Sequence, residues 1–194
     1  MSEAVTVPAL RFPEFEGAWE DTKLGELMKI SSASRVLKDE WTEDGVPFFR
    51  SSDVVSIYKG TENKKAFISK DLFEELSRKS GHLVKDDLLV TGGGSIGIPY
   101  LVTSNDPLYS KDADLIWLKN GESTSGPFIY AFLVSQVFRK YLKSISHIGT
   151  ISHYTIEQAK ATPINLPSLP EQKKIAAFLG VVDAKLTALR DRVA

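Results

Sequence analysis

Short runs of apolar residues, separated by glycine, asparagine and proline, dominate the first half of the chain. Between residues 46 and 102 these runs are FFRSSDV, AFISK and DLLVTG. The run YLVTSND is also β-like, and a further run, DADLIWLK, ends at the turn dipeptide Asn120-Gly121. Runs of this length with such punctuation are typical of β-strands. We therefore predict a series of short strands in this part of the chain.

Other segments have the periodicity of helices. Residues 71–80, DLFEELSRKS, place their leucines and phenylalanine on one side, and Gly81 follows where a left-handed C-cap residue belongs. Residues 126–145 carry a proline suited to a first helical turn and are apolar over more than one face, which predicts one central helix. A short helix is expected at residues 156–159, and residues 11–17 are expected to form an irregular strap on the surface.

The last part of the chain contains a proline-rich connector and a helix with a narrow apolar seam. The stretch ATPINLPSLP has three prolines within eight residues, so we expect it to be extended and to end a domain of residues 1–167. In the helix expected over residues 168–194, apolar side chains recur with heptad spacing at Ile175, Leu179, Val182, Leu186, Leu189 and Val193. This seam predicts a coiled coil with another long helix, in an identical copy or a different subunit. Packing of the helix on its own domain is the alternative.

Composition excludes several kinds of chemistry. A chain of 194 residues with 42% hydrophobic residues can bury a core, and it contains no apolar run long enough to span a bilayer. We expect a cytoplasmic protein. With no cysteine and only three histidines, the chain has no thiolate site and little material for a zinc site. We therefore expect neither a metal nor a cofactor.

The overall charge gives no strong field for a polyanion. The chain has 24 basic and 25 acidic residues, so any DNA-binding surface must be local. Lys59, Lys64, Lys65 and Lys70 oppose only Glu62 in one stretch. We predict that the loop lysines Lys59, Lys64 and Lys65 neutralise DNA phosphates, although ordinary solvated lysines would give the same pattern.

A second candidate DNA contact is the segment Arg50-Ser51-Ser52, which follows Pro47-Phe48-Phe49. Its three side chains could donate hydrogen bonds to DNA. The alternative is equally compatible with the sequence: Ser52 or Asp53 caps a turn, and Arg50 pairs with a nearby acid.

A glycine loop, Gly92-Gly93-Gly94-Ser95-Ile96-Gly97, follows a predicted strand and satisfies the G-x-G-x-x-G pattern of dinucleotide-binding proteins. That pattern requires a helix starting in the loop, whereas the run YLVTSND that follows it here is β-like. We therefore prefer a loop that approaches a DNA phosphate through exposed groups, at Thr91, Gly93, Gly94 and Ser95.

The polar loop of residues 146–154 combines hydroxyl groups, two imidazoles and a phenol beside a glycine. Such side chains can donate and accept hydrogen bonds at base edges in the major groove. The predicted base-reading residues are His147, Thr150, Ser152, His153 and Tyr154. A polar loop that merely covers a helix end is the alternative, and no G-x-S-x-G nucleophile motif is present.

The order of several motifs resembles one known family. WEDTKLGEL, PFFRSSDV, DDLLVTGGGSIG and SHYTIEQAKATPINLPSLPEQKKIAAFLGVVDAKL follow one another as in the specificity (S) subunits of type I restriction-modification systems. The most specific motif is PINLPSLPEQKKIAAFL with the following Asp183, and the resemblance extends from about Arg11 to the end. It implies an α+β fold, with a methyltransferase-type DNA target-recognition domain followed by a coiled-coil spacer helix.

The resemblance also implies a function without catalysis. S subunits bind double-stranded DNA and hold modification subunits, which methylate adenine, and through them the restriction subunits. Each recognition domain is expected to read one half of a split target. Complete S subunits have two recognition domains and two spacer helices, so this chain is expected to be a natural half that self-dimerises, or an N-terminal piece of a longer subunit.

Two other functional classes stay open at this point. The chain could be a coiled-coil interaction module whose globular part binds protein. Less consistent with the pattern is an enzyme that binds a nucleotide through residues 92–97.

Overall fold

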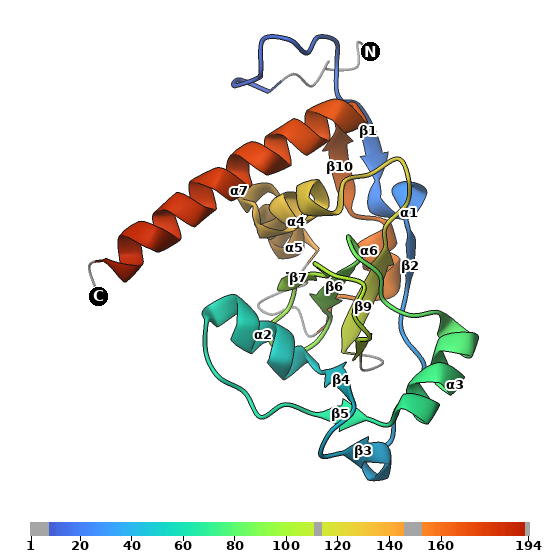
Figure 1. The fold of residues 1–194 in the computed structure, drawn as a ribbon. Helices are drawn as coiled ribbons and strands as arrows, with labels where there is room; N and C mark the ends of the chain where they lie inside the picture. Colours follow the sequence, from blue (N-terminus) through green and yellow to red (C-terminus); the bar gives the residue numbers. More distant parts are fainter. Residues whose placement is uncertain (1–7, 111–113, 146–152, 193–194) are drawn as a thin grey trace.

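The computed structural model describes residues 8–110, 114–145 and 153–192, which form an α+β body and one long projecting helix (Figure 1). The strands are β1 (Glu20–Lys23), β2 (Lys29–Ser31), β3 (Trp41–Thr42), β4 (Val46–Phe49), β5 (Phe67–Ile68), β6 (Leu88–Thr91), β7 (Pro99–Leu101), β8 (Tyr109–Ser110), β9 (Leu115–Lys119) and β10 (Pro163–Leu166). The helices are α1 (Leu24–Leu27), α2 (Ser51–Lys59), α3 (Lys70–Ser80), α4 (Gly126–Val134), α5 (Gln136–Ser144), α6 (Ile156–Lys160) and α7 (Leu169–Asp191), with a 3-10 turn at Lys38–Glu40. The predicted α+β class is confirmed.

Three small sheets organise the body. The central sheet has the order β2-β9-β6-β7 and is antiparallel throughout. A second sheet, β3-β5-β4-β8, contains one parallel pair, β4 with β8. Its strands β3, β4 and β5 lie below the central sheet in Figure 1. A third sheet is the two-stranded pair β1-β10, which lies where α7 begins.

The central strands are buried on both faces, which explains their unbroken apolar sequence. All four residues of β6 and residues 115–118 of β9 are buried. On one face, Leu88, Val90 and Ile116 pack in a cluster with α4 and α5, and on the other Leu89 and Trp117 pack with Val54 of α2. The helices on either side therefore hold the sheet whose loops carry the predicted DNA contacts.

A buried carboxylate holds the start of the central sheet together. Asp87 is 1% exposed and accepts hydrogen bonds from the indole Nε1 of Trp117 at 2.9 Å, from the amide of Asn120 at 2.8 Å and from the amide of Val84 at 3.1 Å. A buried carboxylate is tolerated when its oxygens accept several hydrogen bonds. Asp87 thereby ties β6 to the end of β9.

Several predicted elements are confirmed. The helix predicted at 71–80 is α3, and the short helix predicted at 156–159 is α6. The hydroxyl of Ser69 caps α3 by accepting a hydrogen bond from the amide of Leu72. Gly81 has the expected positive φ of 81°, but its ψ of −177° is extended, so the left-handed helical conformation predicted for it is wrong.

Two predictions of secondary structure are wrong. The run FFRSSDV is a strand only up to Phe49, because the Asp53 carboxylate accepts a hydrogen bond from the amide of Arg50 and thereby starts α2. The single helix predicted over 126–145 is divided at Ser135, which has an extended ψ of 161°. The Ser135 hydroxyl caps the new helix by accepting a hydrogen bond from the amide of Phe138.

The proline-rich connector is extended as predicted, but it is part of the body. Residues 163–166 pair with β1 in antiparallel register, from Glu20 opposite Leu166 to Lys23 opposite Pro163. Helix α7 then begins at Leu169, packs first against α4, and extends away from the body in Figure 1. Within the described residues, no helix is both long and apolar enough to cross a membrane.

The buried carboxylate leads to a first prediction. Replacing Asp87 with alanine should lower the free energy of unfolding by about 3 kcal/mol, because the buried indole of Trp117 and two part-buried backbone amides lose their acceptor. Urea denaturation monitored by tryptophan fluorescence measures this change. As a control, the exposed Asp44→Ala should stay within about 0.5 kcal/mol of the parent, and equal stability of the two variants would contradict the role of Asp87.

Candidate nucleic-acid interface

The end of α2 and the loop after it present the three predicted lysines to solvent. Gly60 ends α2 in the left-handed conformation, with φ 65° and ψ 32°, and the chain then turns back toward β5. Lys59, the last residue of α2, is exposed, as are Lys64 and Lys65 on the loop. The amide of Asn63 donates to Asp53 Oδ1 at 2.8 Å and to Ser52 Oγ at 3.2 Å, so the loop is tied to the first turn of α2.

Arg50 is bonded within the protein. Its Nε donates to Asp53 Oδ2 at 2.8 Å and its Nη2 to Asp53 Oδ1 at 3.0 Å, while Nη2 also donates to the carbonyl of Lys64. The guanidinium lies 5.4 Å from the ring centre of Trp41, and the hydrogen bonds with Asp53 raise the pKa of Arg50. This ion pair is the alternative that the sequence left open for Arg50, and its bond to the carbonyl of Lys64 positions the backbone that carries this lysine.

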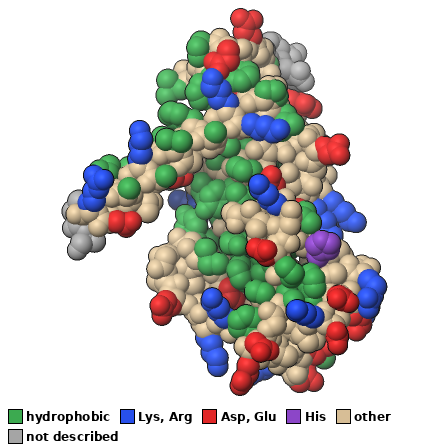
Figure 2. Space-filling view, viewed as in Figure 1, with side chains coloured by type: hydrophobic (Ala, Val, Ile, Leu, Met, Phe, Trp, Pro, Cys, Tyr) green, Lys and Arg blue, Asp and Glu red, His purple; other side chains and the backbone are tan. Residues whose placement is uncertain are grey.

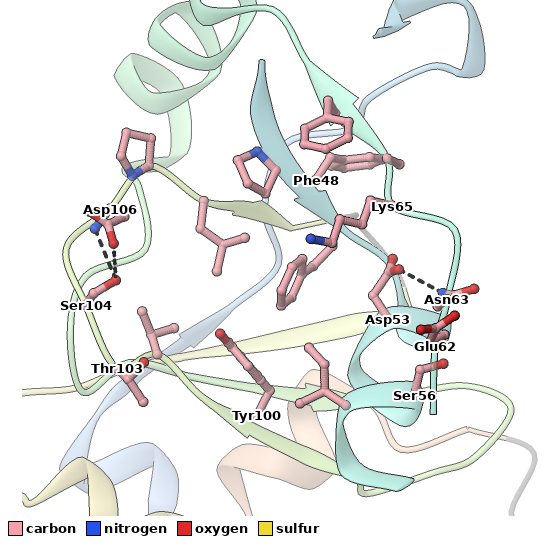
Figure 3. A pocket seen from close by; sticks show the side chains of 18 of the residues that line it. Phe48, Asp53, Ser56, Glu62, Asn63, Lys65, Tyr100, Thr103, Ser104 and Asp106 are labelled. Carbon is pink, nitrogen blue, oxygen red and sulfur yellow. Dashed lines mark hydrogen bonds between the residues drawn. The ribbon is translucent and has the colours of Figure 1, made fainter. Parts of the chain in front are cut away.

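A cavity of about 660 Å³ lies behind this loop (Figure 3). It is bounded by α2, by the loop of residues 61–66, by Tyr100 of β7 and by residues 102–108. Phe49 and Tyr100 form part of its wall, with ring centres 5.1 Å apart in an edge-to-face arrangement. In Figure 3 the ammonium group of Lys65 and the hydroxyl group of Tyr100 both point into the cavity. Lys65 therefore differs in orientation from a simple surface lysine.

The glycine loop is exposed at its tip and buried at its base. Gly94 has a positive φ of 67° and is exposed, as is Ser95. Thr91 is fully buried, and its hydroxyl donates to the carbonyl of Ser95 and accepts from the amide of Ile98 at 2.9 Å. The predicted DNA contact of Thr91 is therefore wrong, because this side chain shapes the loop from inside. A strand, β7, follows the loop, so the helix that dinucleotide binding requires is not there.

The polar loop before α6 is described only from His153 onward. His153 is exposed and forms an isolated antiparallel bridge with Gly93. Tyr154 is 2% exposed, its hydroxyl lies 2.6 Å from that of Thr162, and burial raises its pKa. The predicted base-reading role of Tyr154 is corrected to a core role. His147, Thr150 and Ser152 lie outside the described residues.

Asp114 joins the glycine loop to the start of α2. Its carbonyl accepts hydrogen bonds from the hydroxyl of Ser51 at 2.9 Å and from the amide of Gly92 at 2.9 Å. A Cβ on Gly93 would lie 3.3 Å from Asp114 Oδ1 and 3.7 Å from the His153 ring. The predicted positions Ser51, Gly93 and His153 thus meet around one residue.

These bonds form a continuous strip between segments that are distant in sequence. From Lys64, the strip passes through the contacts of Asn63, Arg50 and Asp53 to Ser51, then through Asp114 to Gly92, whose neighbour Gly93 forms the bridge with His153. We call this set the polar strip. Sequence analysis missed Asn63, Asp114 and the cavity residue Tyr100, because their relevance comes from contacts between residues ten or more positions apart.

The apolar seam of α7 is mostly exposed. Ile175 and Val182 are half-buried, whereas Leu179, Leu186 and Leu189 are 39%, 46% and 57% exposed. Figure 2 shows hydrophobic side chains along the projecting arm and on the body beside it. Phe178 and Val181, each 56% exposed, add to this surface and were not predicted. Val193 lies outside the described residues.

Charges of both signs are interspersed on the face shown in Figure 2. This agrees with a formal net charge of −1 for the whole chain. This face of the molecule can therefore supply local cations and hydrogen-bonding groups, but no continuous positive surface.

Comparisons with known proteins match this chain to DNA specificity subunits. A family model described as the type I restriction modification DNA specificity domain matches residues 16–192. A putative type I restriction enzyme specificity subunit of Haemophilus influenzae, S.HindORF215P, is 27% identical over 81% of this chain and 38% of its own length. The type I restriction enzyme MjaVIII specificity subunit of Methanocaldococcus jannaschii is 30% identical over 85% of this chain and 39% of its own length.

Solved structures share the fold. The HsdS subunit from Thermoanaerobacter tengcongensis superimposes with a TM-score of 0.65 at 19% identity, over 97% of this chain and 42% of that chain. The type I restriction-modification S subunit from M. genitalium gives a TM-score of 0.60 at 17% identity, over 89% of this chain and 41% of that one. The chain thus spans about two-fifths of the length of the proteins it matches.

The bonds of Arg50 lead to a second prediction. Replacing Arg50 with alanine should accelerate amide hydrogen exchange of residues 61–66 by about tenfold or more, because the charged hydrogen bonds that hold this loop are lost. Exchange followed by mass spectrometry measures the effect. Arg35→Ala removes an exposed arginine as a control and should leave the loop unchanged, and unchanged exchange in both variants would refute the positioning role.

Proposed function

The chain belongs to the family of type I restriction-modification DNA specificity domains, and on this premise we propose that it reads one half of a bipartite DNA target. The observation that carries the proposal is the polar strip, which joins two separately predicted DNA contacts, the lysine loop and the glycine loop, through a series of hydrogen bonds. A reading surface needs both phosphate contacts and donors or acceptors for base edges. The strip provides both kinds of group.

We assign the phosphate contacts to cations and backbone amides at the two ends of the strip. Lys59 and Lys64 are exposed beside α2, and Gly94 is exposed in a loop with positive φ. Exposed lysines attract phosphates without strict geometry, and loop amides bind them directionally. These contacts would fix the register of the duplex without selecting its sequence.

Base reading is assigned to polar side chains that lie between these contacts. Ser95 and His153 are exposed at the glycine loop, and Ser52 is exposed at the start of α2. The predicted residues His147, Thr150 and Ser152 precede His153 directly in sequence and belong to the same proposal. Lys65 and Tyr100 offer an ammonium and a hydroxyl group in the cavity beside them. Groups of these kinds hydrogen-bond to base edges in the major groove.

The role we propose includes assembly and no chemistry of its own. The seam of α7 would pair with a second spacer helix, in another S half or an identical copy, and the paired helices would hold modification subunits and through them restriction subunits. Exposed apolar side chains at Leu179, Leu186 and Leu189 support this pairing. A DNA target also implies a cytoplasmic location.

A third prediction tests DNA reading, using the chain assembled with its helix partner. Lys64→Ala should weaken binding by a similar factor on all sequences and should reduce the slope of log affinity against log salt by about 0.9, the value for one phosphate contact. His153→Ala should instead change which bases are selected. Selection from a degenerate duplex library and fluorescence anisotropy at several salt concentrations measure the two effects.

The exposed Lys173 on α7 provides the control, since Lys173→Ala should change neither quantity. Equal retention of all duplexes by the parent protein would remove the DNA-reading proposal and favour a protein-interaction module. A change of sequence preference in Lys64→Ala would reverse the assignment of its role.

A fourth prediction tests the helix seam. Glutamates at both Leu186 and Leu189 should abolish self-association or assembly with a partner helix, because the charges would be buried at the seam. Sedimentation velocity measures the assembly, and circular dichroism checks that the body is folded. Ala184→Glu lies on the opposite side of α7 and should assemble normally, whereas normal assembly of the double variant would contradict the pairing.

A further inference from the structure

A buried ion pair fastens the first turn of α7 to the strap at the start of the chain. Glu171 is 1% exposed and accepts hydrogen bonds from Nε and Nη2 of Arg11, each at 2.8 Å. The indole Nε1 of Trp19 donates to the same carboxylate at 3.2 Å. The remaining donors of Arg11 bind the carbonyls of Gly17 and Glu16. A two-point pair of this kind fixes orientation as well as distance.

The next residue fastens α7 to a different element. The side-chain oxygen of Gln172 accepts a hydrogen bond from the amide of Ser125 at 2.9 Å, and its nitrogen donates to the carbonyl of Pro167 at 2.9 Å. Ser125 is the N-cap residue of α4. Adjacent residues of a helix point about 100° apart. Glu171 and Gln172 therefore hold α7 from two directions, which restricts both its tilt and its rotation.

The strap follows α7 for two turns. Lys174 forms an ion pair with Glu14, and its ammonium lies 4.8 Å from the ring centre of Phe12. The same ring contacts Phe178 edge-to-face, with ring centres 5.8 Å apart. We call the contacts of Arg11, Phe12, Glu14 and Trp19 with α7 the helix clamp. Arg11, Phe12 and Glu14 precede the range matched by the family model, which begins at residue 16.

The part of α7 that follows the clamp amplifies any change of tilt at the clamp into a larger displacement at the helix tip. Asp191 lies 20 positions after Glu171, which corresponds to about 30 Å of helix at 1.5 Å per residue. A tilt of about 10° at the clamp would displace the tip by about 5 Å. This exceeds the rise of about 3.4 Å per base pair along the axis of B-DNA. A small change of tilt at the base of the helix would therefore shift a second DNA-reading domain, held at the far end of α7, by more than one base pair.

We propose that the helix clamp sets the direction of α7 relative to the globular body, and so determines how many base pairs separate the two half-sites. This inference rests on the proposed function for its DNA consequence. Arg11, Glu171 and Trp19 are positioning residues, since they lie at the base of α7 and act through its direction. Their effect would be on spacing, whereas the bases within each half-site would be selected as before.

The geometric part of the fifth prediction uses spin labels, for which the absence of cysteine gives a clean background. Labels at Glu74→Cys on α3 and Lys185→Cys on α7 occupy exposed positions on the body and the projecting helix. Pulsed electron–electron double resonance should give one narrow distribution of the distance between the two labels in the parent. Arg11→Ala and Glu171→Gln should broaden it or shift it by several ångströms, whereas Glu16→Ala, which removes an exposed side chain, should not.

The functional part compares duplexes whose half-sites are separated by different spacers, again with the chain assembled with its helix partner. The parent should prefer one spacer length, and Arg11→Ala should tolerate spacers at least one base pair longer or shorter with the same half-site sequences. Arg11→Lys, which keeps the charge and loses the two-point contact, should lie between them. If Glu171→Gln fails to fold, Arg11→Ala and Trp19→Phe provide the same test.

The outcomes separate the two proposals. An unchanged distance distribution together with an unchanged spacer preference in Arg11→Ala would overturn the clamp. Failure of the parent to select any bipartite duplex, with the distribution broadened in Arg11→Ala, would overturn the proposed function and leave the clamp's control of helix direction supported.

Discussion

The antiparallel pairing of β1 with β10 is the constraint on which the rest of the structure depends. It brings residues 20–23 beside residues 163–166, and the amide of Leu24 continues the contact with the carbonyl of Thr162 at 3.0 Å. Because these strands immediately follow the strap and precede α7, their pairing places Arg11 and Trp19 within reach of Glu171. This pairing thus acts together with the packing of α7 on α4 and the bond of Gln172 to Ser125 to fix the long helix on the body.

The second consequence of this closure concerns the central sheet. α1 and α6, which flank the paired strands, pack against each other and against β2, so the closure supports one side of the sheet. β6 and β9, buried on both faces, then place the glycine loop and Asp114 at adjacent strand ends. The central sheet therefore positions one end of the polar strip, and the bonds of Arg50 and Asn63 hold the other end on the loop of residues 61–66.

Local patterns predicted those elements whose signals lie within a few residues. The amphipathic run that became α3, the apolar runs of β6 and β9, and the proline-started helix α7 were all recognised from their own sequence. The break at Ser135 was missed, because a serine in an apolar helical run gives no clear signal until its hydroxyl is seen to cap the next helix. The start of α2 was missed for a similar reason, since Asp53 was treated as a turn residue.

The errors in the predicted exposure of site residues arose from tertiary contacts that the sequence does not show. Thr91 and Tyr154 were predicted to face DNA because polar residues in glycine-containing loops are usually exposed. Both are buried, with hydroxyl groups bonded to Ser95 and Ile98 in one case and paired with Thr162 in the other. Lys59 and Lys64 are exposed as expected. No pattern within the sequence indicated that Asp114 would join the two loops.

The low net charge of the protein makes the fixed direction of α7 important. The net charge of −1 and the interspersed acidic residues give no strong positive field, so under the proposed function one globular body alone would bind DNA weakly and with a shallow dependence on salt. Joining two such bodies makes the second binding event intramolecular and raises the overall affinity without any new contact. That gain is lost when the spacing does not match the DNA. A weakly charged body therefore requires a well-fixed helix, and the buried carboxylate of Glu171 supplies the fixed point.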